Sequence, residues 1–131
     1  MVKQAEAVTV AIGKDFLTAF SRIPQKKQAK VSNFISKFKA DPRMPGINYE
    51  KIAKAKDAKL CSVRIDRDYR GIVLKPEKEN VYVLLWVDQH DRAYRWAENR
   101  VYSIHPETGS LQVFDVGKTI AMSVNFDTFI F

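Results

Sequence analysis

The sequence is poor in cysteine, glycine and proline, and each shortage excludes a class of protein. Its only cysteine, Cys61, cannot form a disulfide within the chain, which argues against a disulfide-stapled secreted scaffold. Glycine and proline occur five times each in 131 residues, too rarely for a collagenous or low-complexity chain. No apolar run approaches the roughly 20 residues of a membrane span, and residues 1–10 contain no apolar signal-peptide core. We therefore expect a cytoplasmic protein that does not enter a membrane.

Metal-ligating residues are also scarce. The two histidines, His90 and His105, and Cys61 match no zinc-ligand spacing. The sequence therefore predicts neither a metal nor another cofactor.

Acidic residues are absent between Phe16 and Ala40, although the chain as a whole carries a formal net charge of +7. Basic residues recur through the same stretch, at Arg22, Lys26, Lys27, Lys30, Lys37 and Lys39. A one-sided positive field attracts polyanions, of which nucleic acids are the commonest in a cell. The simpler interpretation is that this charge only forms a solvated, soluble face.

Hydrophobic residues make up 46% of the chain, enough for the core of one domain of this length. Alternating apolar residues predict a strand over residues 7–12, which Gly13 ends. Two helices are predicted over residues 14–22 and 25–39, with Pro24 between them. In the second helix, apolar residues recur with helical spacing at Val31, Phe34, Ile35 and Phe38.

Three strands are predicted over residues 60–66, 69–75 and 81–87, joined by short turns as in an antiparallel meander. The last of them is apolar throughout, which indicates a central strand covered on both faces. The lysine-rich stretch before the meander, residues 47–59, is predicted to be a loop with at most one helical turn. The turn over residues 76–80 is predicted from its charge and its proline.

A short helix over residues 92–99, capped by Asp88 or Asp91, is expected after the central strand. A C-terminal hairpin should follow, with its turn at residues 106–109. The fold class is therefore α+β, with helices on one face of an antiparallel sheet. We expect a domain over residues 1–116 and a C-terminal extension over residues 117–131.

Several residues whose side chains could take part in catalysis lie near the strand ends of the predicted meander. Arg64 lies on the polar face of its strand, and Arg70 begins the next strand across the turn. His90, Asp91 and Tyr94 follow the end of the central strand. If the strands pair as predicted, all five residues gather near one edge or face of the sheet.

Two segments resemble the RelE/ParE toxin superfamily. Residues 60–73, LCSVRIDRDYRGIV, resemble the family's strand with an RxR or vRvgdyR-like pattern that turns into a second strand. The apolar strand over residues 81–87, followed by HDRAY, resembles its hHDxxY-type ending. The N-terminal strand and helical hairpin match as well, so the resemblance covers about residues 7–99. The stretch HDRAYRW is closer to the version of this domain found ahead of UvrD-type helicases.

The resemblance implies a toxin of a toxin–antitoxin system: a ribosome-dependent, metal-independent mRNA endonuclease that inhibits translation. Its partners would be mRNA on the ribosome and a cognate antitoxin protein. The alternatives are a ParE-like protein that targets gyrase, and a catalytically silent module that binds protein or nucleic acid, such as a helicase accessory domain.

The nuclease interpretation assigns a role to each candidate. Arg64 and Arg70 would clamp the scissile phosphate, because a guanidinium fork matches two phosphate oxygens. His90 would transfer the proton, Asp91 would fix its tautomer, and Tyr94 would stack on a base or orient a hydroxyl. Backbone phosphates would be held by basic side chains: Arg22, Lys26, Lys27, Lys30, Lys37, Lys54, Lys56 and Lys59.

Each candidate also has a purely structural interpretation. The two arginines would pair with Asp66 and Asp68, and His90 would be a turn residue. Asp91 would be a plain helix cap. Tyr94 and Trp96 would belong to the core. Only the joint pattern of these residues favours a nuclease.

Overall fold

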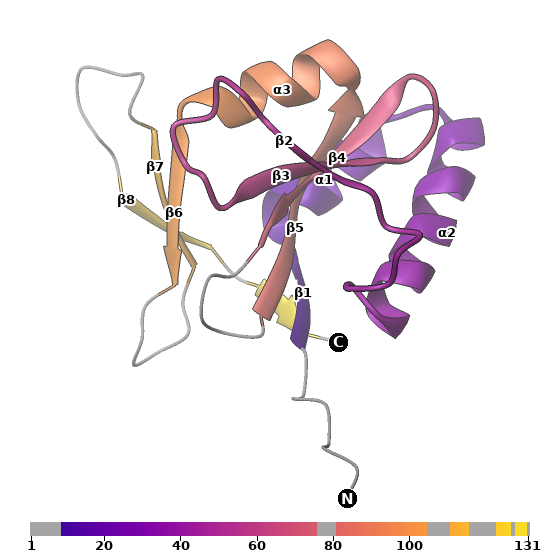
Figure 1. The fold of residues 1–131 in the computed structure, drawn as a ribbon, viewed down its shortest axis with the longest axis horizontal. Coiled ribbons are helices and arrows are strands. Elements are labelled where there is room, and N and C mark those ends of the chain that lie inside the picture. Colours follow the sequence, from indigo (N-terminus) through magenta and orange to yellow (C-terminus); the bar gives the residue numbers. More distant parts are fainter. Residues whose placement is uncertain (1–8, 76–80, 105–110, 116–122, 127, 131) are drawn as a thin grey trace, which may run out of the picture.

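The computed structural model describes residues 9–75, 81–104, 111–115, 123–126 and 128–130. Within these ranges the chain forms an α+β fold with a six-stranded sheet and a separate three-stranded sheet (Figure 1). The strands of the main sheet lie in the order β2 (Tyr49–Lys51), β3 (Leu60–Arg64), β4 (Tyr69–Leu74), β5 (Val81–Gln89), β1 (Thr9–Gly13) and β9 (Thr128–Ile130). The smaller sheet contains β6 (Arg100–Ile104), β7 (Leu111–Asp115) and β8 (Ser123–Phe126).

The predicted helical hairpin and meander are confirmed. Helix α1 spans Lys14–Arg22 and α2 spans Gln25–Ala40. Strands β3, β4 and β5 pair antiparallel, and β5 is buried along most of its length, as expected of a central strand. The C-terminal hairpin is present as the antiparallel pair β6 and β7.

The main sheet is mixed, which corrects the expectation of a purely antiparallel sheet. Strand β1 pairs parallel with β5, with Thr9 opposite Val81 and Ile12 opposite Leu84. The place of β1 inside the sheet follows from its apolar residues on both faces. Val10 and Ile12 pack into one core cluster and Ala11 into the other. A strand that must be covered on both sides is stable inside the sheet, not at its edge.

Helices cover both faces of the sheet, which corrects the expected one-sided arrangement. Helices α1 and α2 bury Phe16, Val31 and Phe38 on one face. Helix α3 (His90–Glu98) packs on the opposite face through Ala93 and Ala97. Its placement is reinforced by Trp96, whose ring stacks on Trp86 of β5 with centroids 5.0 Å apart. Figure 1 shows α3 and α2 on different sides of the strands.

Two local expectations were also wrong. The predicted loop over residues 47–59 contains strand β2, which pairs with β3 through backbone hydrogen bonds although Glu50 and Lys51 are exposed. Helix α3 begins at His90 and has Gln89 at its N-cap, with no side-chain cap bond. Neither Asp88 nor Asp91 therefore caps it.

The segment predicted as a C-terminal extension contributes to both sheets. Strand β8 pairs with β7, and β9 pairs antiparallel with β1 at the edge of the main sheet. Residues 7–8, 76–80 and 105–110, predicted as a strand start and as turns, lie outside the described residues. In the described ranges, no helix combines the length and the apolarity needed to cross a bilayer.

Candidate functional site at the start of helix α3

The start of α3 lies against the turn between β3 and β4. Strand pairing sets Tyr69 opposite Gln89, the last residue of β5. The backbone N–H of His90 then donates to the carbonyl oxygen of Asp68 at 2.8 Å. Two parts of the chain that carry predicted site residues therefore meet at one corner of the sheet.

His90 and Tyr94 form a stacked pair at this corner. They lie one helical turn apart, and their ring centroids are 4.3 Å apart with an interplanar angle of 21°. The Tyr94 hydroxyl lies 2.8 Å from Oγ of Ser62, a fully buried residue of β3, and it donates to Glu50 of β2 at 3.4 Å. The sheet therefore holds Tyr94, and Tyr94 supports one face of the imidazole ring.

The rest of the imidazole ring is open to solvent. The His90 side chain is 45% exposed, and its Nδ1 lies 3.0 Å from Oδ1 of Asp91, a carboxylate that is 89% exposed. A carboxylate at Nδ1 favours the tautomer that carries its proton there, which leaves Nε2 as the free ring nitrogen. The predicted contact between His90 and Asp91 is present.

Arg64 and Arg70 lie opposite each other on neighbouring strands, as the meander predicted. Alternation along β3 sets Arg64 on the same face as Ser62, which contacts Tyr94. Arg64 is exposed, and none of the described residues forms a hydrogen bond or ion pair with its guanidinium group.

The guanidinium group of Arg70 is engaged in a different way. Its Nη1 donates to the carbonyl oxygens of Asp66 at 2.6 Å, Tyr69 at 3.0 Å and Arg67 at 3.4 Å. Its Nε is buried and has no partner among the described residues. Arg70 therefore holds the β3–β4 turn together from within.

Asp66 forms the other half of this turn, and it does not pair with either arginine. Its carboxylate accepts a hydrogen bond from Lys27 of α2 at 2.6 Å and lies 3.5 Å from Lys30. It also accepts the backbone N–H groups of Asp68 and Tyr69, both at 2.8 Å. Burial by itself would raise the pKa of Asp66, but Lys27 and these two N–H groups together hold that pKa well below its usual range. The expected pairing of Asp66 and Asp68 with the arginines is thus replaced by a link to α2.

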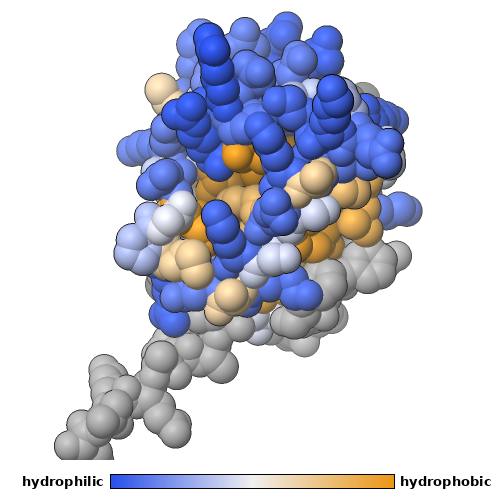
Figure 2. All heavy atoms as spheres, turned by 90° about the vertical axis from the view of Figure 1, so that its right-hand side faces the viewer, coloured by the Kyte–Doolittle hydropathy of each residue, from blue (hydrophilic) through white to orange (hydrophobic). Residues whose placement is uncertain are grey.

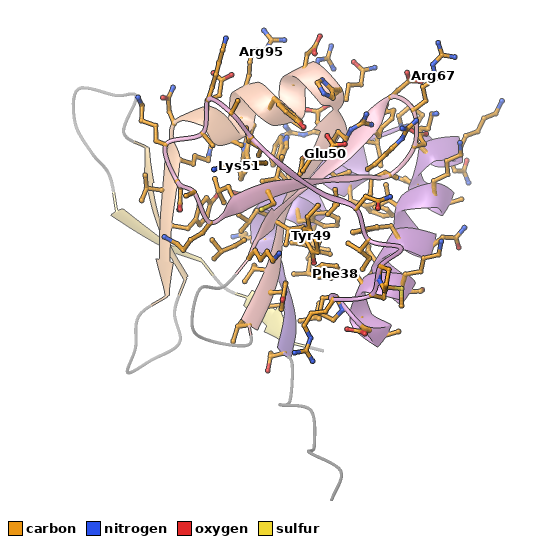
Figure 3. The ribbon with its side chains drawn as sticks, in the orientation of Figure 1. Phe38, Tyr49, Glu50, Lys51, Arg67 and Arg95 are labelled. Carbon is orange, nitrogen blue, oxygen red and sulfur yellow. The ribbon has the colours of Figure 1, made fainter. Side chains whose placement is uncertain are left out.

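Two clefts meet at His90 and Asp91, which line both of them. The first, of about 540 Å³, lies between the start of α2, the β3–β4 turn and the start of α3, and its basic residues are Lys26, Lys27 and Arg67. The second, of about 520 Å³, lies between α3 and the segment after β2, and its basic residues are Lys51, Lys54 and Arg95. Figure 3 shows Arg67 and Arg95 projecting outward at the α3 end of the molecule, with Glu50 and Lys51 below α3.

The predicted phosphate-binding cations are divided between the two sides of the sheet. Lys26, Lys27 and Lys54 reach the two clefts at His90. The other five do not line these two clefts. Lys30 pairs with Asp66 and Lys59 pairs with Asp57. Lys37 lies in the last turn of α2, Lys56 lies in the segment before β3, and Arg22 lines a third cleft. Figure 2 shows that hydrophilic side chains cover most of the α2 side, with apolar residues visible between them.

Three basic residues at this corner were not among the predicted candidates: Lys51, Arg67 and Arg95. A signal was available for Arg95, because it lies four residues after Asp91 and therefore on the same flank of α3. Arg67 lies in the turn between the two strands that carry Arg64 and Arg70. Lys51 belongs to the lysine-rich stretch over residues 47–59, but strand β2, which positions it, was not expected.

In the part of the chain that the structure describes, histidine, cysteine, aspartate and glutamate side chains do not gather in a group of three or more suited to a metal ion. Comparison of the chain with family models, curated proteins and solved structures finds no match. The chemistry of the α3 corner must therefore be inferred from its own residues.

Proposed function

We propose that the chain is a RelE-like toxin, a ribosome-dependent and metal-independent mRNA endonuclease whose reaction centre is His90. The observation that carries this proposal is the stacked His90–Tyr94 pair, which lies where two clefts meet, each lined by three basic and two acidic residues. Basic grooves bind the phosphates of a single strand, and open aromatic ring faces accept unpaired bases. Arg64 adds an unpaired guanidinium group at the end of the neighbouring strand.

The reaction consists of an in-line transfer within the RNA. Nε2 of His90 takes the proton of a ribose 2′-OH, and the 2′ oxygen forms a bond to the adjacent phosphorus. The bond from phosphorus to the 5′ oxygen breaks, and that oxygen takes a proton from solvent water. The products are a 2′,3′-cyclic phosphate and a 5′-OH. Arg64 neutralises the charge that builds up on the phosphate oxygens, which is usually the largest contribution to such catalysis.

Two of the predicted site residues have supporting roles in this proposal. Tyr94 is a positioning residue, because its hydroxyl is held by Ser62 and its ring orients His90. Arg70 is also a positioning residue, because its Nη1 is committed to the carbonyl oxygens of the β3–β4 turn. The phosphate clamp therefore has one guanidinium group, Arg64, instead of the two that the sequence suggested.

A second candidate function is a nucleic-acid-binding module that does not cleave, such as a helicase accessory domain. The engagement of Arg70 favours it, because this leaves fewer free cations for the transition state than the sequence suggested. Both candidates share the same RNA-binding corner. Only the fate of the bound RNA separates them.

Primer extension on cellular mRNA after brief expression distinguishes these candidates. Wild-type protein should produce new 5′ ends inside translated regions, and the ends should vanish when translation is blocked. His90→Ala should reduce cutting by about 10²–10⁴-fold, the usual contribution of a general base. Lys37→Gln, at an exposed cation away from the corner, should cut like the wild type. Growth arrest with intact mRNA and altered DNA supercoiling would favour the gyrase alternative, and undiminished cutting by His90→Ala would exclude His90 as the base.

A further inference from the structure

A third cleft continues the first one past the start of α3. It has a volume of about 410 Å³ and lies between the end of α1, the end of β5 and the first turn of α3. It shares Pro24, Tyr69 and Gln89 with the first cleft, and the first cleft shares His90 and Asp91 with the second. The three clefts therefore follow one another around the N-terminal end of α3.

Two arginines from different helices line this third cleft, Arg22 of α1 and Arg92 of α3. Both are exposed, and neither guanidinium group has a hydrogen-bond or ion-pair partner among the described residues. The one acidic residue in the lining is Asp88, whose Oδ1 accepts the backbone N–H of Gln89 at 2.8 Å. Two unpaired guanidinium forks that line the same cleft suit a phosphate group, which offers several acceptor oxygens.

Trp86 of β5 forms part of the wall of this cleft. Its indole Nε1 is buried without a hydrogen-bond partner among the described residues. Because buried polar groups are nearly always satisfied, an unpartnered N–H on a residue of the cleft wall makes Trp86 a suitable probe for a bound acceptor. The remaining wall is largely apolar, with Ile23 and Val87 among its residues.

We propose that the cleft of Arg22 and Arg92 is a phosphate-binding subsite for single-stranded RNA, on the far side of His90 from the Lys51–Arg95 cleft. This inference rests on the proposed function, since it takes RNA to be the polyanion at the α3 corner. A single strand fits better than a duplex, because the row of three clefts bends around the N-terminal end of α3 and passes the half-exposed ring of His90. The RNA then contacts cations in three consecutive clefts.

The test is the salt dependence of binding to a short single-stranded RNA with a fluorescent label, measured by anisotropy. Each phosphate contact on a single strand contributes about 0.7 to the slope of log affinity against log salt. The double variant Arg22→Gln/Arg92→Gln should lower the slope by about 1 to 1.5 and weaken binding at low salt by about 10–100-fold. The matched control is Lys37→Gln/Arg43→Gln, which removes two charges that line none of the three clefts.

The control should change the slope by less than half as much as the cleft variant does. Equal slopes for the wild type and the cleft variant, with RNA still bound, would overturn the subsite. Thermal unfolding of the cleft variant should match the wild type, because neither arginine has a partner to lose among the described residues.

A second measurement separates the failure of the subsite from the failure of the proposed function. The chain has two tryptophans, so its NMR spectrum should contain two indole N–H signals, which Trp96→Phe assigns. Titration with inorganic phosphate should move the Trp86 signal in the wild type and not in Arg22→Gln/Arg92→Gln. If the wild type binds no RNA but this shift occurs, the cleft remains an anion site and the RNA proposal is lost. If the signal does not move, the cleft is not a phosphate site.

Discussion

Arg64→Ala should lower the rate of mRNA cleavage by about 10²–10³-fold while leaving the fold intact, because loss of one preorganised charge at a reacting phosphate has effects of that size. Arg64 is exposed, and no described residue depends on its guanidinium group. Its free energy of unfolding should therefore stay within about 0.5 kcal/mol of the wild-type value. Arg64→Lys should recover only part of the rate, because an ammonium group lacks the planar fork.

Arg70→Ala provides the matched comparison, since Arg70 lies directly opposite Arg64 in the sheet. Here we expect a loss of stability of about 1–3 kcal/mol, because partly buried carbonyl oxygens of the β3–β4 turn would lose their charged donor. Single-turnover cleavage of ribosome-bound mRNA and urea unfolding measure the two effects. If Arg64→Ala cleaves at the wild-type rate, Arg64 has no part in the mechanism. If Arg70→Ala is as stable as the wild type, the structural role of Arg70 is contradicted.

Asp57→Ala should be strongly destabilising, by roughly 2–5 kcal/mol, because it leaves the buried backbone N–H of Tyr102 and two partly buried donors of Lys59 without their acceptor. Asp57 is only 4% exposed. Its Oδ1 accepts the backbone N–H of Lys59 at 3.0 Å and lies 3.1 Å from the Lys59 ammonium group. Its Oδ2 accepts the backbone N–H of Tyr102 at 2.9 Å. One side chain thus fastens the segment before β3 to strand β6.

Asp57→Asn distinguishes the hydrogen bonds from the charge. An asparagine retains one carbonyl oxygen, so we expect a smaller loss of stability than in Asp57→Ala. Asp91→Ala is the exposed control and should change the free energy of unfolding by no more than about 0.5 kcal/mol. Urea denaturation at neutral pH gives all three values. A small effect of Asp57→Ala would mean that the link between the two segments does not contribute to folding.

The parts of the fold that follow local patterns were predictable. The helical spacing of Val31, Phe34 and Phe38 gave α2, and all three residues are buried. The alternation in β3 and β4 gave the correct faces, and short turns fixed the antiparallel pairing. The same pairing predicted that Arg64 and Arg70 would lie side by side.

The remaining features depend on contacts between distant segments. The parallel pairing of β1 with β5 joins residues about 70 positions apart, and nothing local indicates it. The ion pair of Lys27 and Asp66 crosses 39 positions. Strand periodicity gave the face on which Arg70 lies, but not that its guanidinium group turns back onto its own loop. The positions of the basic residues along the sequence also did not reveal that their side chains would be divided between the two sides of the sheet.

The most direct test of the central claim is the chemistry of the cut ends. Purified protein is incubated with ribosomes that carry a defined mRNA, and the termini of the products are determined. The proposed mechanism predicts a 2′,3′-cyclic phosphate and a 5′-OH at one position in the ribosome-bound mRNA, no cut when that ribose is replaced by its 2′-deoxy form, and a greatly reduced cut with His90→Ala. A 5′-phosphate at the cut, or cleavage of the 2′-deoxy mRNA, would contradict it.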